Sequence, residues 1–158
     1  MTGKAKVLAA FVASVVAMAV AGTVAQTQFV LSALRAAGAT VSSSDLIAMS
    51  GADLVGFAPV YAAIIALGFA IAFLLAGFAR RWVSLPRTLV FAAAGAGCIA
   101  LMLYMMQLVF FGIPLIAGTR TAAGTFVQIG LGALAGALFA SLSAPGNRRG
   151  PTTRSIAQ

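Results

Sequence analysis

The segment that decides the fold of this chain is DLVGFAPVYAAIIALGFAIAFLLAGFARR, residues 53–81. Between Asp53 and Arg80 lie 26 residues without a charge. A helix rises about 1.5 Å per residue, so roughly 20 apolar residues cross the ~30 Å hydrocarbon core of a bilayer. The segment is therefore long enough to span a membrane, and the arginine pair that begins at Arg80 marks its end.

The composition of the whole chain agrees with a membrane location. Of its 158 residues, 62% are hydrophobic and only 8% are charged, and the mean hydropathy is +1.09. Soluble domains carry about 25% charged residues, so a water-soluble fold of this composition would lack a polar surface. A chain of this length and character is expected to form a single membrane domain.

Three further apolar runs accompany the first. We predict an all-α membrane protein, a four-helix transmembrane bundle within residues 1–144, with an outer loop over 26–53 and a basic, flexible tail over 145–158. The predicted spans are 7–25, 54–79, 88–111 and 125–144.

The first run has an alternative interpretation. Lys4 and Lys6 precede it, and Ala19 and Ala21 form an A-x-A pattern, which is the outline of a cleavable signal peptide. The run is longer than the usual apolar region of about 7–15 residues in such peptides, so we favour an uncleaved first helix.

The distribution of charge predicts the orientation. One side of the predicted bundle carries eight cations and no anion: Lys4, Lys6, Arg80, Arg81, Arg87, Arg148, Arg149 and Arg154. The other side carries two cations and two anions, which cancel: Arg35, Arg120, Asp45 and Asp53. The positive-inside rule therefore predicts that both termini are cytoplasmic, in a multi-pass protein of a bacterial-type inner membrane.

Several function classes are disfavoured by the residues themselves. The chain has no histidine and one cysteine, Cys98, so it lacks the usual ligands of zinc and haem and cannot form an internal disulfide. We expect no metal site and no catalytic residue. The net charge of +8 comes from short clusters beside the spans rather than from a basic stripe, so we expect no nucleic-acid partner.

A group of polar side chains at membrane depth is the candidate site. Its predicted members all lie toward the outer side of the spans: Gln26, Tyr61, Tyr104, Gln107 and Gln128, with Arg35, Asp53 and Arg120 at the rim. Polar groups at this depth tend to face the interior of a bundle and to find partners there. Two interpretations remain open. The group makes hydrogen bonds between helices, or it forms a shallow pocket for the head group of a lipid, quinone or pigment.

Small residues recur at spacings of about four along every span. Such residues let helix backbones approach closely in a membrane, where hydrophobic attraction between helices is absent. The candidate packing positions are Ala13, Ala17, Gly68, Ala72, Gly97, Gly132 and Gly136. They serve packing within the bundle or contact with another subunit.

The sequence therefore favours a non-catalytic accessory or scaffold subunit of a larger inner-membrane complex, in contact with lipids and with other membrane subunits or copies of itself. The alternative is a small oligomeric transporter or channel that uses the outer polar group. An enzyme acting on lipid-like substrates is the least favoured class, because no nucleophile has a base partner.

Overall fold

The computed structural model describes residues 3–38, 40, 42–56, 58–109 and 121–144. Within these ranges the chain is helical and contains no strand. Its five helices, in chain order, are α1 (Gly3–Ala36), α2 (Ser43–Gly56), α3 (Ala58–Ala79), α4 (Arg87–Val109) and α5 (Ala122–Leu142). The predicted tail over 145–158 lies outside the described residues.

Four of the helices, α1, α3, α4 and α5, are long and apolar enough to cross a membrane. This confirms the predicted all-α fold with four membrane-spanning helices. The chain is accordingly a multi-pass membrane protein.

The first span continues further than its apolar run suggests. The 34 residues of α1 make a helix of about 51 Å, which exceeds the ~30 Å hydrocarbon core. The segment 26–53, expected as an outer loop, thus contains the end of α1 and most of α2. Gly38 follows the helix with a φ of +89°, a left-handed conformation that favours glycine and is common just after a helix end.

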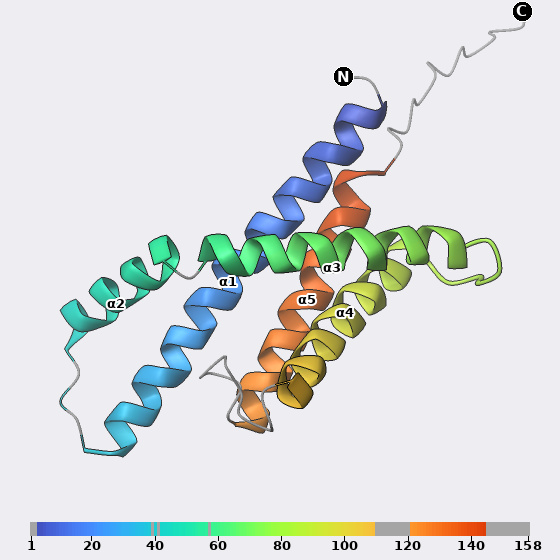
Figure 1. Ribbon diagram of the computed structural model, residues 1–158. Helices are drawn as coiled ribbons and strands as arrows, with labels where there is room; N and C mark the ends of the chain where they lie inside the picture. The colour runs from blue at the N-terminus through green and yellow to red at the C-terminus, as the bar shows by residue number, and fades with distance from the viewer. Residues whose placement is uncertain (1–2, 39, 41, 57, 110–120, 145–158) are drawn as a thin grey trace, which may run out of the picture.

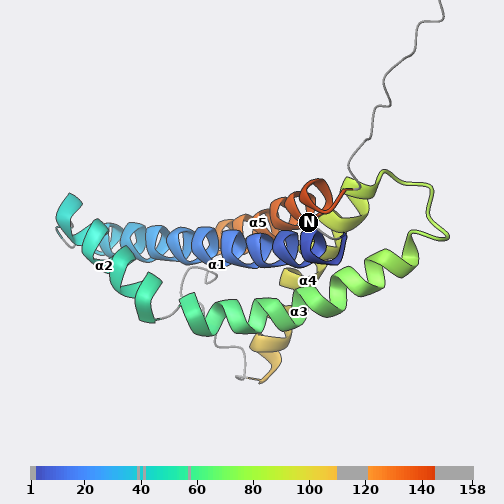
Figure 2. The ribbon, with the colours of Figure 1, turned by 90° about the horizontal axis from the view of Figure 1, so that it is seen from above.

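The arrangement of the helices is seen in Figures 1 and 2. α5 lies beside α1 and is paired with α4, whereas α3 runs across one side of this group and contacts both α1 and α4. The start of α1 and the end of α5 lie at the same end of the bundle, where the Lys6 ammonium group donates to the carbonyl of Ala144 at 2.5 Å.

We use two names for the ends of the bundle. The basic end holds the start of α1, the end of α3 and the start of α4, with the cations Lys4, Lys6, Arg80, Arg81 and Arg87. The α2 end holds the end of α1, all of α2 and the start of α3 and α5.

The closest helix pair is α4 with α5, and glycines make that contact. A Cβ atom built on Gly136 would lie 2.0 Å from the carbonyl oxygen of Phe91, and one built on Gly95 would lie 2.1 Å from that of Gly132. Real Cβ atoms do not approach a backbone so closely, so the two helices pack backbone against backbone.

Aromatic side chains fill the core toward the basic end. The ring of Phe73 on α3 stacks on Phe139 of α5 with centroids 4.5 Å apart, and it meets Phe91 of α4 edge-on at 5.7 Å. Phe69 and Phe11 complete the cluster at 4.8 and 6.4 Å from Phe73. Such stacked and edge-to-face contacts add to the dispersion that holds helices together in lipid.

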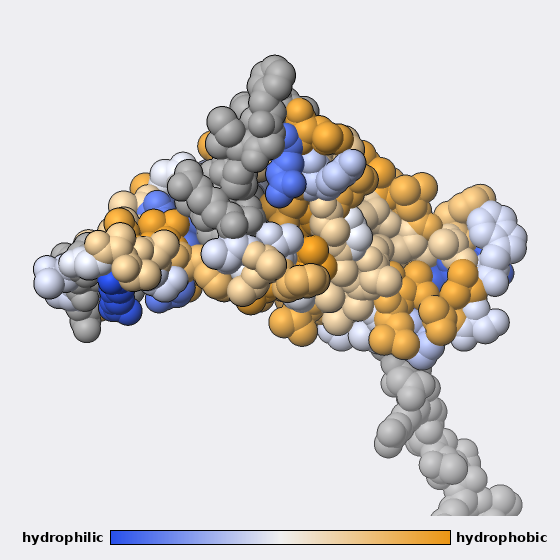
Figure 3. Space-filling model, turned by 90° about the horizontal axis from the view of Figure 1, so that it is seen from below, coloured by the Kyte–Doolittle hydropathy of each residue, from blue (hydrophilic) through white to orange (hydrophobic). Residues whose placement is uncertain are grey.

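Figure 3 shows that strongly hydrophilic residues cover only small areas of one face of the molecule, whereas apolar residues cover most of it. Large apolar side chains such as Leu67, Leu74 and Leu101 are more than half exposed. This surface suits contact with lipid tails, which are as apolar as leucine.

Candidate functional site

A cluster of polar side chains lies at the α2 end, between four helices. We call it the polar cluster and define it by Thr23, Gln26 and Thr27 of α1, Asp53 of α2, Tyr61 of α3 and Gln128 of α5. Thr23, Thr27, Tyr61 and Gln128 are almost completely buried. Thr23 and Thr27, Tyr61 and Gln128 belong to the buried rows of α1, α3 and α5, respectively. Gln26 of α1 and Asp53 of α2 are only partly buried.

Gln128 joins three helices. Its amide nitrogen Nε2 donates to the carbonyl oxygen of Gly22 at 2.8 Å, and its oxygen Oε1 accepts from the hydroxyl of Tyr61 at 3.3 Å. Both Gln128 and Tyr61 are only 2% exposed. A buried polar group without a partner is costly in an apolar medium, so these bonds fix the relative position of α1, α3 and α5.

Gly22 provides the space for this junction. A Cβ atom at this position would lie 2.9 Å from Cε1 of Tyr61 and 3.0 Å from Oε1 of Gln128. The absence of a side chain therefore lets two polar side chains reach the surface of α1.

Thr27 attaches α2 to α1. Its hydroxyl Oγ1 lies 2.8 Å from the carboxylate oxygen Oδ2 of Asp53 and 3.0 Å from the carbonyl oxygen of Thr23, to either of which it donates. A hydrogen bond to a carboxylate is stronger than one between neutral groups. Asp53 thus has a hydrogen-bond partner within the chain and is not an isolated charge at the rim of the polar cluster.

Two oxygen atoms of the polar cluster are buried without a hydrogen-bond partner among the described residues. They are the hydroxyl Oγ1 of Thr23 and the amide oxygen Oε1 of Gln26. The cluster therefore retains some capacity to accept a hydrogen bond, although Thr23 is completely buried.

The structure brings together only some of the predicted site residues. Tyr61 and Gln128 are in contact, Asp53 bonds to α1, and Gln26 is half-buried nearby on α1. Tyr104 is 57% exposed, and Gln107 is exposed as well, so neither side chain is buried in the bundle. Arg35 is exposed in the last turn of α1, and Arg120 lies outside the described residues.

Sequence reasoning missed Gly22, Thr23 and Thr27. Gly22 and Thr23 lie in a run of valine and alanine, whereas Thr27 lies between Gln26 and Gln28, beyond the predicted span. One signal was available, because Thr23 and Thr27 are four residues apart, as on one face of a helix, and Gly22 adjoins them.

The predicted packing residues have different surroundings. Gly132 and Gly136 face α4 within the chain, and a Cβ at Gly68 would lie 2.8 Å from the Cys98 sulfur. Gly97 differs, because a Cβ there would meet no atom within 4 Å. Three alanines have partly exposed positions: Ala13 and Ala17 on α1, and Ala72 on α3.

The polar cluster offers little chemistry beyond hydrogen bonding. Its one carboxylate accepts a hydrogen bond from the Thr27 hydroxyl, and the chain contains no histidine that could act as the base of a nucleophile. Within the described ranges, no three His, Cys, Asp or Glu side chains gather as a metal site would require. The arrangement is that of a structural junction between helices.

Comparison with protein-family models, with curated proteins and with solved structures gives no match to this chain. Its function is therefore argued from the geometry alone.

Proposed function

We propose that this protein is a non-catalytic accessory or scaffold subunit of a larger assembly in a bacterial-type inner membrane, with both termini cytoplasmic. The basic end supports this orientation, because five of the cations of the described residues gather there. The subunit binds its partner through helix faces inside the membrane and contributes no reacting group.

The observation that carries this proposal is an uncovered groove between α3 and α4. Its volume is about 550 Å³, and small residues from both helices lie along it, among them Gly68, Ala72, Ala94 and Gly97. Larger side chains such as Leu67 and Leu101 border it. Small residues beneath a groove allow a further transmembrane helix to approach closely.

The position of α3 explains why the groove stays open. α3 crosses the other helices instead of running alongside α4, as Figure 1 shows, so the two helices diverge on either side of their contact. The glycines at the contact between α4 and α5 are covered by the chain itself, whereas Gly97 remains open. The groove is thus a packing surface that no described part of the chain occupies.

The packing of the described residues within one chain leaves no evident path for an ion or a polar solute. Gln128 and Tyr61 are buried and hydrogen-bonded within the polar cluster, and the packed rings of Phe73, Phe91 and Phe139 fill the core on the way to the basic end. An ion or a polar solute would find no continuous polar surface among these described residues. The transporter alternative therefore requires a path between subunits.

Native mass spectrometry after gentle extraction from the native membrane tests the proposal. We expect the wild-type chain to emerge in a complex of defined composition, and we expect Gly97→Leu to be released from it. The control is Gly130→Leu, because a Cβ at Gly130 also meets no atom within 4 Å but Gly130 does not line the groove. The Cβ atom of either leucine meets no described atom within 4 Å.

Two outcomes would contradict the proposal. One is a wild-type protein that emerges as a monomer under all gentle conditions. The other is a complex that Gly97→Leu and Gly130→Leu disturb equally, since this would show that the groove is not the contact surface.

A further inference from the structure

A second cavity lies at the basic end, between the start of α1, the middle of α3 and the start of α4. Its volume is about 670 Å³, within the range of about 300–1,000 Å³ that is usual for ligand pockets. Its walls are apolar and largely aromatic, with Phe11, Phe73 and Phe91 among them. It is separate from the polar cluster and from the groove between α3 and α4.

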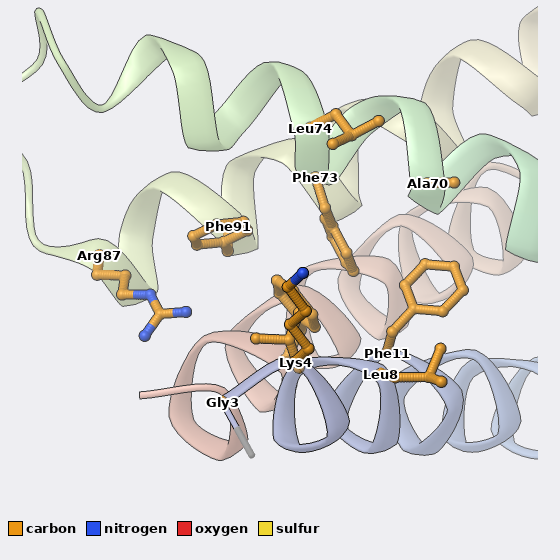
Figure 4. A pocket seen from close by; sticks show the side chains of 11 residues that line it. Gly3, Lys4, Leu8, Phe11, Ala70, Phe73, Leu74, Arg87 and Phe91 are labelled. Carbon is orange, nitrogen blue, oxygen red and sulfur yellow. The ribbon is translucent and has the colours of Figure 1, made fainter. Parts of the chain in front are cut away.

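Two cations from different helices complete this cavity. Lys4 of α1 and Arg87 of α4 both belong to its lining, and Figure 4 shows both side chains beside the space between the helices. Arg87 lies toward the end of the cavity where α1 begins, and Phe11 and Ala70 lie toward the opposite side. The cavity therefore has a charged part and an apolar part.

Arg87 is held in position but its donors are not all used. Its Nη2 atom donates to the hydroxyl of Ser143 at 2.6 Å, and its guanidinium carbon lies 5.4 Å from the centroid of the Phe91 ring. Its Nε atom is buried and has no hydrogen-bond partner among the described residues. A guanidinium group with a spare buried donor favours an anionic acceptor such as phosphate.

The chain offers no side chain that would neutralise these cations. It contains two acidic residues, Asp45 and Asp53, and both belong to α2 at the other end of the bundle. No acidic side chain therefore lies at the cavity to balance its charge. An occupant that fits has a negative head beside an apolar tail.

We propose that this cavity binds an anionic glycerophospholipid, with its phosphate beside Lys4 and Arg87 and an acyl chain against Phe11, Phe73 and Leu74. Basic pockets between transmembrane helices are suited to such head groups. In the proposed orientation the lipid comes from the cytoplasmic leaflet, which is the leaflet nearest the basic end.

The test compares two lipids with identical acyl chains on the full-length protein, purified and delipidated in a neutral detergent. Phosphatidylglycerol and phosphatidylcholine are titrated separately, and bound lipid is counted by native mass spectrometry. We expect one tight phosphatidylglycerol site with a preference of about 30-fold over phosphatidylcholine, the amount expected from two cations near the membrane surface.

Substitutions in the cavity sharpen the test. Lys4→Gln should lower the preference about fivefold, and Lys4→Gln with Arg87→Gln should abolish it. The control Arg81→Gln removes the same charge at the same end but lies outside the cavity, and it should keep the full preference. Ala70→Phe, which fills the apolar part, should weaken phosphatidylglycerol binding without a change of charge.

Two further measurements distinguish the proposed lipid binding from a loss of folding and from the binding of free phosphate. The melting temperature without lipid shows whether each variant is folded, and Lys4→Gln alone decides the matter if the double variant does not fold. Inorganic phosphate should not raise the melting temperature as phosphatidylglycerol does. Equal affinity for both lipids, full preference in Lys4→Gln, or the whole effect from inorganic phosphate would overturn the proposal.

Discussion

Gln128 at the α2 end and Arg87 at the basic end are both polar side chains of membrane-spanning helices, but their surroundings differ. Gln128 is enclosed, and both its amide nitrogen and its oxygen bond to other helices of the same chain. Among the described residues, Arg87 donates one hydrogen bond, to Ser143, and its buried Nε atom finds no acceptor; the side chain borders an apolar cavity. The paired Gln128 side chain holds helices of the fold together, whereas the incompletely paired Arg87 side chain borders the cavity in which we propose that a lipid binds.

The largest loss of stability is expected for Gly22→Val, at the α2 end. The added side chain would clash with Tyr61 and Gln128, so we expect a loss of about 3 kcal/mol in the free energy of unfolding. Unfolding in neutral detergent, followed by far-ultraviolet circular dichroism, measures it. Gly130→Val is the control and should change stability by less than about 0.5 kcal/mol, because that position is open. Equal stability of the two variants would contradict the described junction.

The two glutamines provide the next comparison. Gln128→Leu leaves the Gly22 carbonyl and the Tyr61 hydroxyl without this buried partner, and we expect a loss of about 1–2 kcal/mol. Gln107→Leu should change stability by less than about 0.5 kcal/mol, since that side chain is exposed. The same unfolding measurement applies to both variants. A larger loss of stability in Gln107→Leu than in Gln128→Leu would contradict the finding that Gln128 is the buried, hydrogen-bonded residue of the two.

Thr23 and Thr27 allow a hydrogen-bonded hydroxyl and one without a described partner to be compared within one helix, α1. Thr27→Val removes the hydrogen bond to Asp53 and should cost about 1 kcal/mol. Thr23→Val removes a buried hydroxyl that has no hydrogen-bond partner in the described part of the chain, so it should be neutral or slightly stabilising. Urea unfolding of the two variants side by side gives the difference. Equal losses would show that Thr23 also has a partner in the membrane, such as bound water.

The sequence was sufficient to predict the four spans, because a run of about 20 apolar residues has few alternatives to a transmembrane helix. The hydropathy signal alone does not show that α1 continues to Ala36. Residues 26–36 contain polar and charged side chains that end the hydropathy signal, although the helix itself goes on beyond the membrane core.

The composition of the polar cluster could be predicted only in part. Gln107 and Gln128 have the same depth in their spans, but the rotation of each helix about its axis decides which one faces inward. On α4 the buried row Phe91, Gly95, Ile99 and Leu103 does not include Gln107, since steps of four residues drift around a helix of 3.6 residues per turn. The cavity with Lys4 and Arg87 was beyond sequence reasoning, because it depends on which helices are neighbours.

The proposed difference between Gln128, which holds the fold, and Lys4, which binds a lipid, can be tested with one set of melting curves. The melting temperature of the wild type, Gln128→Leu and Lys4→Gln is determined with and without phosphatidylglycerol. We expect Gln128→Leu to melt lower in both conditions by the same amount, and Lys4→Gln to match the wild type without lipid but to gain less from its addition. A lipid-free loss in Lys4→Gln as large as in Gln128→Leu, or a lipid effect abolished by Gln128→Leu, would contradict the account.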